Sequence, residues 1–178
     1  MYLSRLTTAL LALAWLAGCT SLSEVAPAGL DLSGEWVVDE AASDPPPDVD
    51  AIRSREDRRV ARGRQRDPTA SGAFVAQDFP VLAATRLVIE QDRESMGVRY
   101  FRGDDSSYLD FTWGKRERDF WQVRTGWQEG ELVILSERGG VEGTERLRLE
   151  DGGRRLRVSV SVDTGGEKVR SERVFDRR

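Results

Sequence analysis

The sequence of 178 residues contains no histidine, and its only cysteine is Cys19. These absences exclude a Ser-His-Asp triad, a Cys-His pair, haem ligation by histidine, and a zinc site built on histidine and cysteine. A single cysteine also excludes a disulfide within the chain. The formal net charge is −4, whereas nucleic-acid binding usually requires a clear basic excess. We therefore expect no catalytic residues, no metal site, no cofactor and no nucleic-acid partner.

Long hydrophobic runs are also scarce, and the longest lies at residues 6–17, directly after Arg5. It is too short to span the ~30 Å of hydrocarbon in a bilayer and has the length of a signal-peptide core. The run ends in Leu-Ala-Gly-Cys at 16–19, which resembles the lipobox of bacterial lipoproteins. The resemblance implies a signal peptide at 1–18 and lipidation of Cys19. An ordinary secretory signal, with Cys19 incidental, is the alternative.

By the same resemblance, Thr20 in place of an aspartate after the cysteine favours the outer membrane. The expected location is therefore the cell envelope, on the periplasmic side of the bacterial outer membrane, with the membrane as a partner through lipidated Cys19. Residues 19–30 are small, polar and interrupted by Pro27 and Gly29. This composition predicts a flexible tether between the lipid and a domain at 31–178.

The stretch 145–162 shows what the domain is made of. Leu147 and Leu149 alternate with charged residues before Asp-Gly-Gly at 151–153, and apolar residues alternate with polar ones after it. A period of two is typical of half-buried antiparallel strands, and the glycines favour a tight turn. A hairpin alone cannot bury its apolar face. We therefore expect the rest of the domain to complete a sheet around it.

Similar alternation recurs along residues 31–178, which we interpret as one domain. The candidate strands are 31–39, 85–91, 96–101, 107–113, 119–128, 132–138, 145–150, 156–162 and 169–175. Turns of a few residues join most of them, and closure of an up-and-down sheet removes its exposed edges. The predicted fold is all-β, a single antiparallel up-and-down β-barrel of about eight or nine strands.

Residues 40–83 interrupt the strands with a charged insertion. Pro45, Pro46 and Pro47 end the first strand, because consecutive prolines remove donors from the ladder. The segment 51–66 carries seven arginines, from Arg53 to Arg66, and little apolar surface. It predicts a mobile loop or a short, mostly solvated helix. Its charges serve either solubility or contact with anionic lipid or an envelope protein, at ~1 kcal/mol per basic residue near a membrane. Residues 74–80 are expected to fold back as a lid or plug on an open barrel end.

Aromatic residues are concentrated in two neighbouring candidate strands, 107–113 and 119–128. Inward aromatic side chains either fill a small barrel or line a pocket for one ligand, and the sequence leaves both outcomes open. The candidate ligand-binding residues in the barrel interior are Trp36, Leu109, Phe111, Trp113, Trp121, Val123 and Trp127.

The first strand opens with Gly34, Glu35 and Trp36, which resembles the Gly-x-Trp opening of lipocalins and related calycin barrels. Together with the phrases at 85–92, 126–137, 144–162 and 173–177, it makes the chain resemble small secreted bacterial proteins with a lipocalin-like, calycin-type domain. The resemblance implies the fold and a broad expectation of binding small or amphipathic molecules, and it brings no catalytic motif. In lipocalins a basic residue of the last strand packs over the tryptophan, which implies a cation–π contact between Arg173 and Trp36.

Three functions are compatible with this sequence. The first is a non-catalytic, membrane-anchored envelope lipoprotein whose barrel binds a small apolar or amphipathic ligand, and it is the one we expect. The second is an interaction module that docks an envelope protein or anionic lipid through its outer face or the arginine-rich insertion. The third is a carboxylate-dependent hydrolase. Asp110 is its one candidate acid, because Leu109 and Phe111 flank it.

Overall fold

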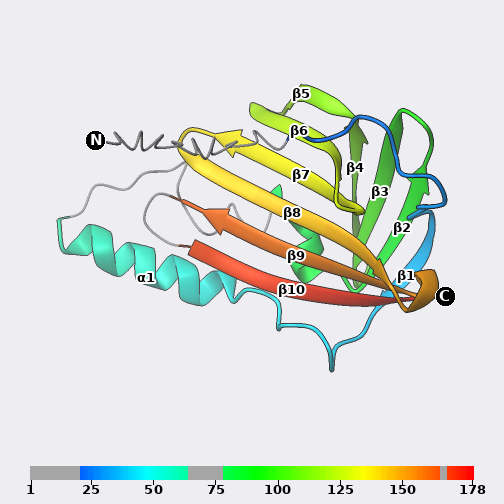
Figure 1. Ribbon diagram of the computed structural model, residues 1–178. Coiled ribbons are helices and arrows are strands. Elements are labelled where there is room, and N and C mark those ends of the chain that lie inside the picture. Colours follow the sequence, from blue (N-terminus) through cyan, green and yellow to red (C-terminus); the bar gives the residue numbers. More distant parts are fainter. Residues whose placement is uncertain (1–20, 64–77, 165–167) are drawn as a thin grey trace, which may run out of the picture.

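The computed structural model describes residues 21–63, 78–164 and 168–178. Within them, ten antiparallel strands form one sheet in the order β4-β3-β2-β1-β10-β9-β8-β7-β6-β5. Because β1 pairs with β10, the up-and-down sheet curls into a barrel (Figure 1). The barrel is nearly closed, since its two edge strands, β4 and β5, follow one another in the chain without pairing. No helix of the described ranges is long and apolar enough to cross a membrane.

The prediction of an all-β up-and-down barrel is confirmed, with ten strands in place of eight or nine. The elements are β1 (Gly34–Val38), α1 (Val49–Ala61), η1 (Pro80–Ala83), β2 (Arg86–Gln91), β3 (Ser95–Arg102), β4 (Asp105–Thr112), β5 (Gly114–Arg118), β6 (Trp121–Gln128), β7 (Glu131–Arg138), β8 (Val141–Glu150), η2 (Asp151–Gly153), β9 (Arg155–Asp163) and β10 (Lys168–Arg177). The additional strand is β5. Its sequence Gly-Lys-Arg-Glu-Arg has no apolar alternation, and its pairing with β6 holds it in the sheet.

The predicted hairpin is the pair β8 and β9, which share nine registered residue pairs from Glu142 with Asp163 to Glu150 with Arg155. In its turn, Asp151, Gly152 and Gly153 have φ angles of 52°, 68° and 85°. Glycine adopts such angles without steric cost, so the two glycines permit this tight connection. The apolar residues of β9 that alternate with polar ones are all buried, at Leu156, Val158, Val160 and Val162.

The two ends of the barrel are covered differently. We call one the α1 end, because α1 follows β1 there, together with the β3–β4, β5–β6 and β7–β8 turns. The opposite end holds the start of β1 and the β2–β3, β6–β7 and β8–β9 turns. Leu32 is fully buried at that end, and its backbone N–H donates to the side-chain oxygen of Gln91 at 3.0 Å. The chain therefore closes the opposite end just before β1 begins.

Residues 21–30, here called the strap, lie against the barrel. Ser23 and Trp127 exchange two backbone hydrogen bonds of 2.9 and 2.8 Å. Gly126 makes room for this contact, because a Cβ there would lie 2.7 Å from both the Leu22 Cβ and the Ser23 carbonyl oxygen. This differs from the flexible tether predicted for 19–30. The predicted signal peptide and Cys19 lie outside the described residues.

The charged insertion after β1 contains the short helix predicted from its sequence. Asp48 caps α1, since its carboxylate accepts a 2.8 Å hydrogen bond from the Ala51 N–H. The helix carries four arginines among three acidic residues, and it lies outside the barrel wall (Figure 1). Its sequence has no continuous apolar stripe, so it contributes little to the core. Arg64 and Arg66 of the arginine-rich segment lie outside the described residues.

Residues 78–84, here called the plug, enter the barrel interior from the α1 end. Phe79, Val81 and Leu82 are each no more than 2% exposed. The Phe79 ring packs edge-on against Trp121, with ring centroids 5.7 Å apart. It also lies over Gly143, where a Cβ would come within 2.2 Å of its Cζ. The structure thus places a plug at 78–84 where the sequence predicts one at 74–80, and residues 74–77 lie outside the described residues.

Two arginines hold the plug at its start and its end. Arg138 donates to the Asp78 carboxylate at 3.1 Å, and its guanidinium lies 4.6 Å from the Trp121 ring centroid. Arg173 donates to the carbonyl oxygens of Asp44 at 2.6 Å and Ala84 at 3.0 Å. Because Asp44 lies near the start of the insertion and Ala84 directly follows it, Arg173 joins the two ends of the insertion to β10.

Candidate functional site

The structure buries the residues predicted to line the barrel. Trp36, Phe111, Trp113, Trp121, Val123 and Trp127 are at most 8% exposed, and Leu109 is partly buried against them. The directions of the strands determine which end of the barrel each residue lies near. Trp36, Trp113 and Trp127 lie towards the opposite end, and Trp121 lies at the α1 end. Their contact with a ligand stays a prediction.

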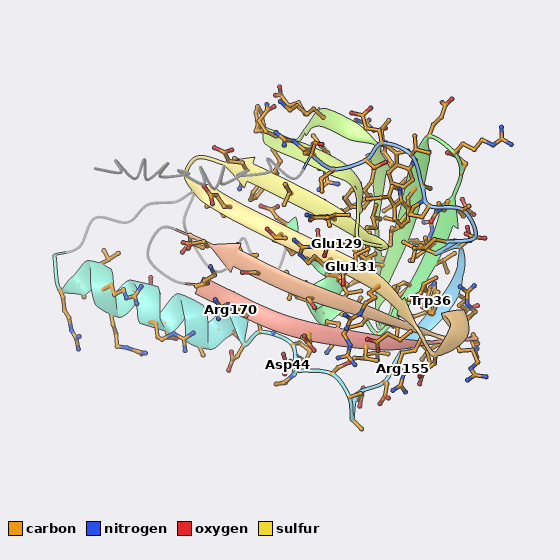
Figure 2. All side chains as sticks on the ribbon, in the orientation of Figure 1. Trp36, Asp44, Glu129, Glu131, Arg155 and Arg170 are labelled. Atoms are coloured by element: carbon orange, nitrogen blue, oxygen red, sulfur yellow. The ribbon has the colours of Figure 1, made fainter. Side chains whose placement is uncertain are left out.

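Trp36 is part of the closed, opposite end of the barrel (Figure 2). Its indole N–H donates to the Leu32 carbonyl oxygen at 2.9 Å, and the Arg177 guanidinium lies 4.2 Å from its ring centroid. The prediction that Arg173 lies over this ring is wrong, because Arg177 occupies that position. Trp36 pairs directly with Arg177 across β1 and β10, whereas Arg173 lies four residues away along β10, about 13 Å at the rise of a strand.

Trp113 and Trp127 pack together near the same end, with ring centroids 5.7 Å apart and ring planes at 69°. Trp113 donates its indole N–H to the Arg93 carbonyl oxygen at 2.9 Å. The indole nitrogen of Trp127 is buried and has no hydrogen-bond partner among the described residues. Trp113 therefore completes the closed end, while Trp127 retains an unused donor.

The barrel interior also holds three polar side chains, here called the interior polar cluster: Tyr100 of β3, Arg118 of β5 and Glu145 of β8. Glu145 is 4% exposed and Tyr100 is 6% exposed. Neither the Glu145 carboxyl nor the Tyr100 hydroxyl makes a hydrogen bond to another described residue. Arg118 Nη1 is buried without a partner, and its guanidinium lies 5.0 Å from the Phe111 ring centroid. The cluster thus holds one buried donor without a partner in the described ranges, Arg118 Nη1, together with two buried residues whose side-chain oxygens bond to no other described residue.

Burial dominates the electrostatics of the cluster. It raises the pKa of Glu145 from 4.5 to about 7, against the opposing effect of the Arg118 charge. It also raises the pKa of Tyr100 well above its usual value, and the negative charge of Glu145 adds to that effect. Both groups lose hydration without gaining a hydrogen bond, which is the circumstance in which burial favours the neutral form.

The row of side chains around Glu145 is partly polar. Strand register aligns Thr125, Ile134, Glu145, Val160 and Ser171 across β6, β7, β8, β9 and β10. Thr125 and Ser171 are buried, and the Ser171 hydroxyl has no hydrogen-bond partner within the described ranges. The wall of the barrel therefore presents hydroxyl groups on both sides of the Glu145 carboxyl.

The sequence analysis did not single out this cluster, although part of its signal was present. Glu145 shares the period-two face of Leu147 and Leu149, which already directs it inward. Tyr100 likewise alternates in phase with Val98 of β3, which is buried. Arg118 gives no such signal, because the apolar alternation stops before β5.

Side chains span the gap between the unpaired edges β4 and β5. Arg116 of β5 bonds to the Asp110 carboxylate of β4, and to the Thr112 hydroxyl at 3.2 Å. Asp110 is 47% exposed at its side chain, so it belongs to the outer rim of the gap. The candidate acid of a hydrolase therefore lies outside the interior. The interior polar cluster holds a single carboxyl, whereas glycosidases use a pair.

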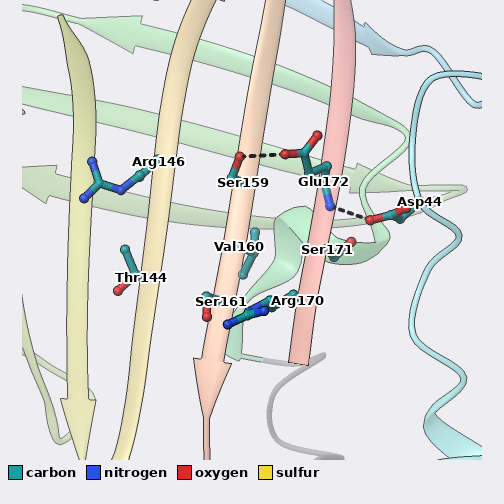
Figure 3. Close-up of a pocket in the computed structure, with 9 residues that line it drawn as sticks. All are labelled: Asp44, Thr144, Arg146, Ser159, Val160, Ser161, Arg170, Ser171 and Glu172. Carbon is teal, nitrogen blue, oxygen red and sulfur yellow. Dashed lines mark hydrogen bonds between the residues drawn. The ribbon is translucent and has the colours of Figure 1, made fainter. Parts of the chain in front are cut away.

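A pocket of about 350 Å³ lies on the outer face of β8, β9 and β10. Figure 3 shows the residues that line it. Its lining includes hydroxyl groups and charged side chains that already have partners. Glu172 pairs with Arg157 at 2.9 Å, and Arg146 pairs with Glu131 at 3.3 Å. Among the described residues, no group of three or more His, Cys, Asp or Glu side chains could hold a metal ion. The interior, with its unsatisfied polar groups, is the stronger candidate site.

No protein-family model and no curated protein matches this chain. Solved structures do match it. The REP1-NXSQ fatty acid transporter is 15% identical with a TM-score of 0.55, over 83% of this chain and 96% of that one. The fluorescent protein UnaG (18% identity, TM-score 0.53) and fatty-acid-binding protein 1 of Echinococcus granulosus (12%, 0.52) each match over 82% of this chain and 96% of theirs. At these identities the likeness concerns the fold alone, an antiparallel up-and-down β-barrel like those of the matched structures.

Proposed function

We propose that this protein is a non-catalytic binding protein whose barrel takes up a small apolar or amphipathic ligand. The observation that carries the proposal is the interior polar cluster. A buried polar group without a hydrogen bond costs about 1–3 kcal/mol, and a barrel that served only as a folded core would gain by replacing it. Arg118 Nη1 is a polar atom of this kind. Glu145 and Tyr100 are buried in the same apolar and aromatic interior, and their side chains bond to no other described residue. A ligand head group supplies the partners that these atoms lack.

The matched structures support this proposal. Two of the three are named as a fatty acid transporter and a fatty-acid-binding protein. The interior described here is apolar on most of its surface, with few polar groups, which is the usual composition of a site for an amphipathic molecule. The plug occupies part of that interior, so we propose that it moves when a ligand enters from the α1 end.

We further propose that the protein is an envelope lipoprotein, anchored through lipidated Cys19 on the periplasmic side of the bacterial outer membrane. The Leu-Ala-Gly-Cys ending of its apolar N-terminal run supports this. Ser23 is fixed on β6 by its two hydrogen bonds to Trp127, and the four Cα-to-Cα steps from Cys19 to Ser23 span at most about 14 Å. A lipidated barrel would therefore stay close to the bilayer, where apolar ligands are found. Substitution of Cys19 by Ser is expected to move the protein from the membrane fraction to the soluble fraction.

Ligand binding is tested by native mass spectrometry of the full chain, extracted from the envelope of a bacterial host and compared with a denatured sample. A discrete added mass that disappears on denaturation supports the proposal, and extraction then gives the ligand class. A bare mass that does not change after incubation with envelope lipids would contradict it.

The alternative of docking through α1 has less support. The helix sequence offsets four arginines with three acidic residues, so it presents little net charge to an anionic membrane.

A further inference from the structure

The interior polar cluster offers a donor and an acceptor to one guest. Arg118 Nη1 is a buried donor without an acceptor, and the carboxyl of the buried residue Glu145 accepts from no other described residue. The two are close enough for the charge of Arg118 to act on Glu145, yet they form no ion pair within 4.0 Å. The Tyr100 hydroxyl lies near the same carboxyl and adds a second donor. A guest placed among these groups meets hydrogen-bonding atoms of both kinds.

The charges of the interior limit which guest fits. Arg118 and Glu145 carry opposite charges, and Arg138 is paired with Asp78 beside the plug. A carboxylate guest would lie near the Glu145 carboxylate, and like charges in a low-dielectric site repel strongly. An ammonium guest would meet Arg118 in the same way. Either ion would leave a buried charge without compensation, which is costly. An uncharged guest leaves the Arg118–Glu145 balance intact.

We propose that the barrel selects amphipathic molecules with an uncharged head group that both donates and accepts hydrogen bonds, such as a fatty amide or a monoacylglycerol. The head group lies among Arg118, Glu145 and Tyr100, accepting from the arginine and donating to the carboxylate. The acyl chain contacts the aromatic residues of the barrel. This inference rests on the proposed function, because it concerns the same interior site.

The test compares matched acyl chains that differ only in their head groups. Dodecanamide, monododecanoylglycerol, dodecanoate and dodecylamine are titrated into the full-length protein at about pH 8, where Glu145 is ionised, with intrinsic tryptophan fluorescence as the readout. The two uncharged probes are expected to bind the wild-type protein about tenfold or more tightly than either ion, a difference of about 1.4 kcal/mol.

Variants that remove one of the two charges are expected to change the preference among the head groups in opposite directions. Glu145→Gln leaves Arg118 uncompensated and is expected to shift the preference about tenfold towards dodecanoate. Arg118→Gln leaves Glu145 uncompensated and is expected to shift it by a similar factor towards dodecylammonium. The double variant removes both charges and is expected to retain the preference for uncharged probes. Glu142→Gln is the matched control, because Glu142 is an exposed glutamate on the same strand.

Each outcome distinguishes between the two proposals. If no probe binds any of the folded variants, the proposed function fails and this inference fails with it. If the probes bind but the wild-type protein prefers dodecanoate or dodecylammonium, the proposed function stands and the inference is overturned. Equal changes in Glu145→Gln and Glu142→Gln would also overturn it. If Arg118→Gln does not fold, the wild-type preference and the Glu145→Gln shift still decide the result.

Discussion

The burial of Glu145 predicts how the free energy of unfolding depends on pH, whether or not a ligand binds. Its pKa is raised from 4.5 to about 7 in the folded protein because it is buried. Below the unfolded pKa both states hold the proton, and the group has no effect on the free energy of unfolding. As the pH rises from about 4.5 to about 7, the unfolded chain releases the proton and the folded protein keeps it. Stability is therefore lost through this window and stays low above it.

The magnitude follows from the size of the pKa change. One pKa unit corresponds to about 1.4 kcal/mol, so ionised Glu145 lowers the free energy of unfolding by about 3 kcal/mol. Between about pH 5 and about pH 8 the loss is about 2–3 kcal/mol, because part of the titration already occurs below pH 5. The free energy of unfolding of a protein domain is about 5–15 kcal/mol, so this change is a large fraction of the total stability.

Glu145→Gln removes the titration and keeps the shape of the side chain. We expect its free energy of unfolding, relative to that of the wild type, to rise by about 2–3 kcal/mol between about pH 5 and about pH 8. Urea unfolding followed by tryptophan fluorescence at both pH values measures this. Comparing variant with wild type cancels carboxyls whose pKa is lowered, such as Glu150, which accepts from Arg157. If the two proteins change in parallel, within about 0.5 kcal/mol, the burial of an ionisable Glu145 is refuted.

Three further substitutions test how the barrel is closed. Gly126→Val is expected to displace Ser23 and lower the free energy of unfolding by about 1–3 kcal/mol, through two lost hydrogen bonds, and unchanged urea unfolding would contradict the strap contact. Arg116→Gln breaks the half-exposed pair with Asp110, so stability changes by less than about 1 kcal/mol. Amide hydrogen exchange in β4 and β5 should nevertheless rise, and equal exchange would show that the pair does not hold the edges. Gly143→Ala places a methyl group against Phe79 of the plug and is expected to lower the free energy of unfolding by about 1–3 kcal/mol. If the thermal unfolding temperature does not change, the plug does not pack against Gly143.

The sequence predicted the barrel because period-two alternation survives wherever a strand has one buried face. β9 is the clearest example, since every second residue of its centre is apolar and buried. β5 could not be found in this way, because the positions that pair with the buried residues of β6 are Gly114, Arg116 and Arg118, none of them an apolar side chain. Two of them contact side chains of β4 across the gap, Arg116 at Asp110 and Arg118 at Phe111. A strand at the edge of a sheet is specified by its partner more than by its own pattern.

The site was predictable only in part, for a related reason. The inward aromatics of β4 and β6 follow from alternation and are buried as expected. The role of the polar residues among them could not be predicted from local alternation, because it depends on which residues from distant parts of the sequence the fold brings together. Glu145 and Arg118 lie on β8 and β5, with β6 and β7 between them. Arg173 shows the same limit, since its partners, Asp44 near the start of the insertion and Ala84 just after its end, are 40 residues apart in the sequence.

The stability and binding predictions for Glu145 constrain one another. An ionised Glu145 lowers the free energy of unfolding by about 3 kcal/mol, a cost that a ligand bound to the folded protein can offset. A ligand that binds only the folded protein stabilises it by about 2.7 kcal/mol at a hundredfold excess over its dissociation constant. If an uncharged head group donates to Glu145, the stability gained in Glu145→Gln should therefore shrink when dodecanamide is present. If the gain is the same with and without dodecanamide, the ligand does not contact Glu145, and the carboxyl must serve some purpose other than recognition.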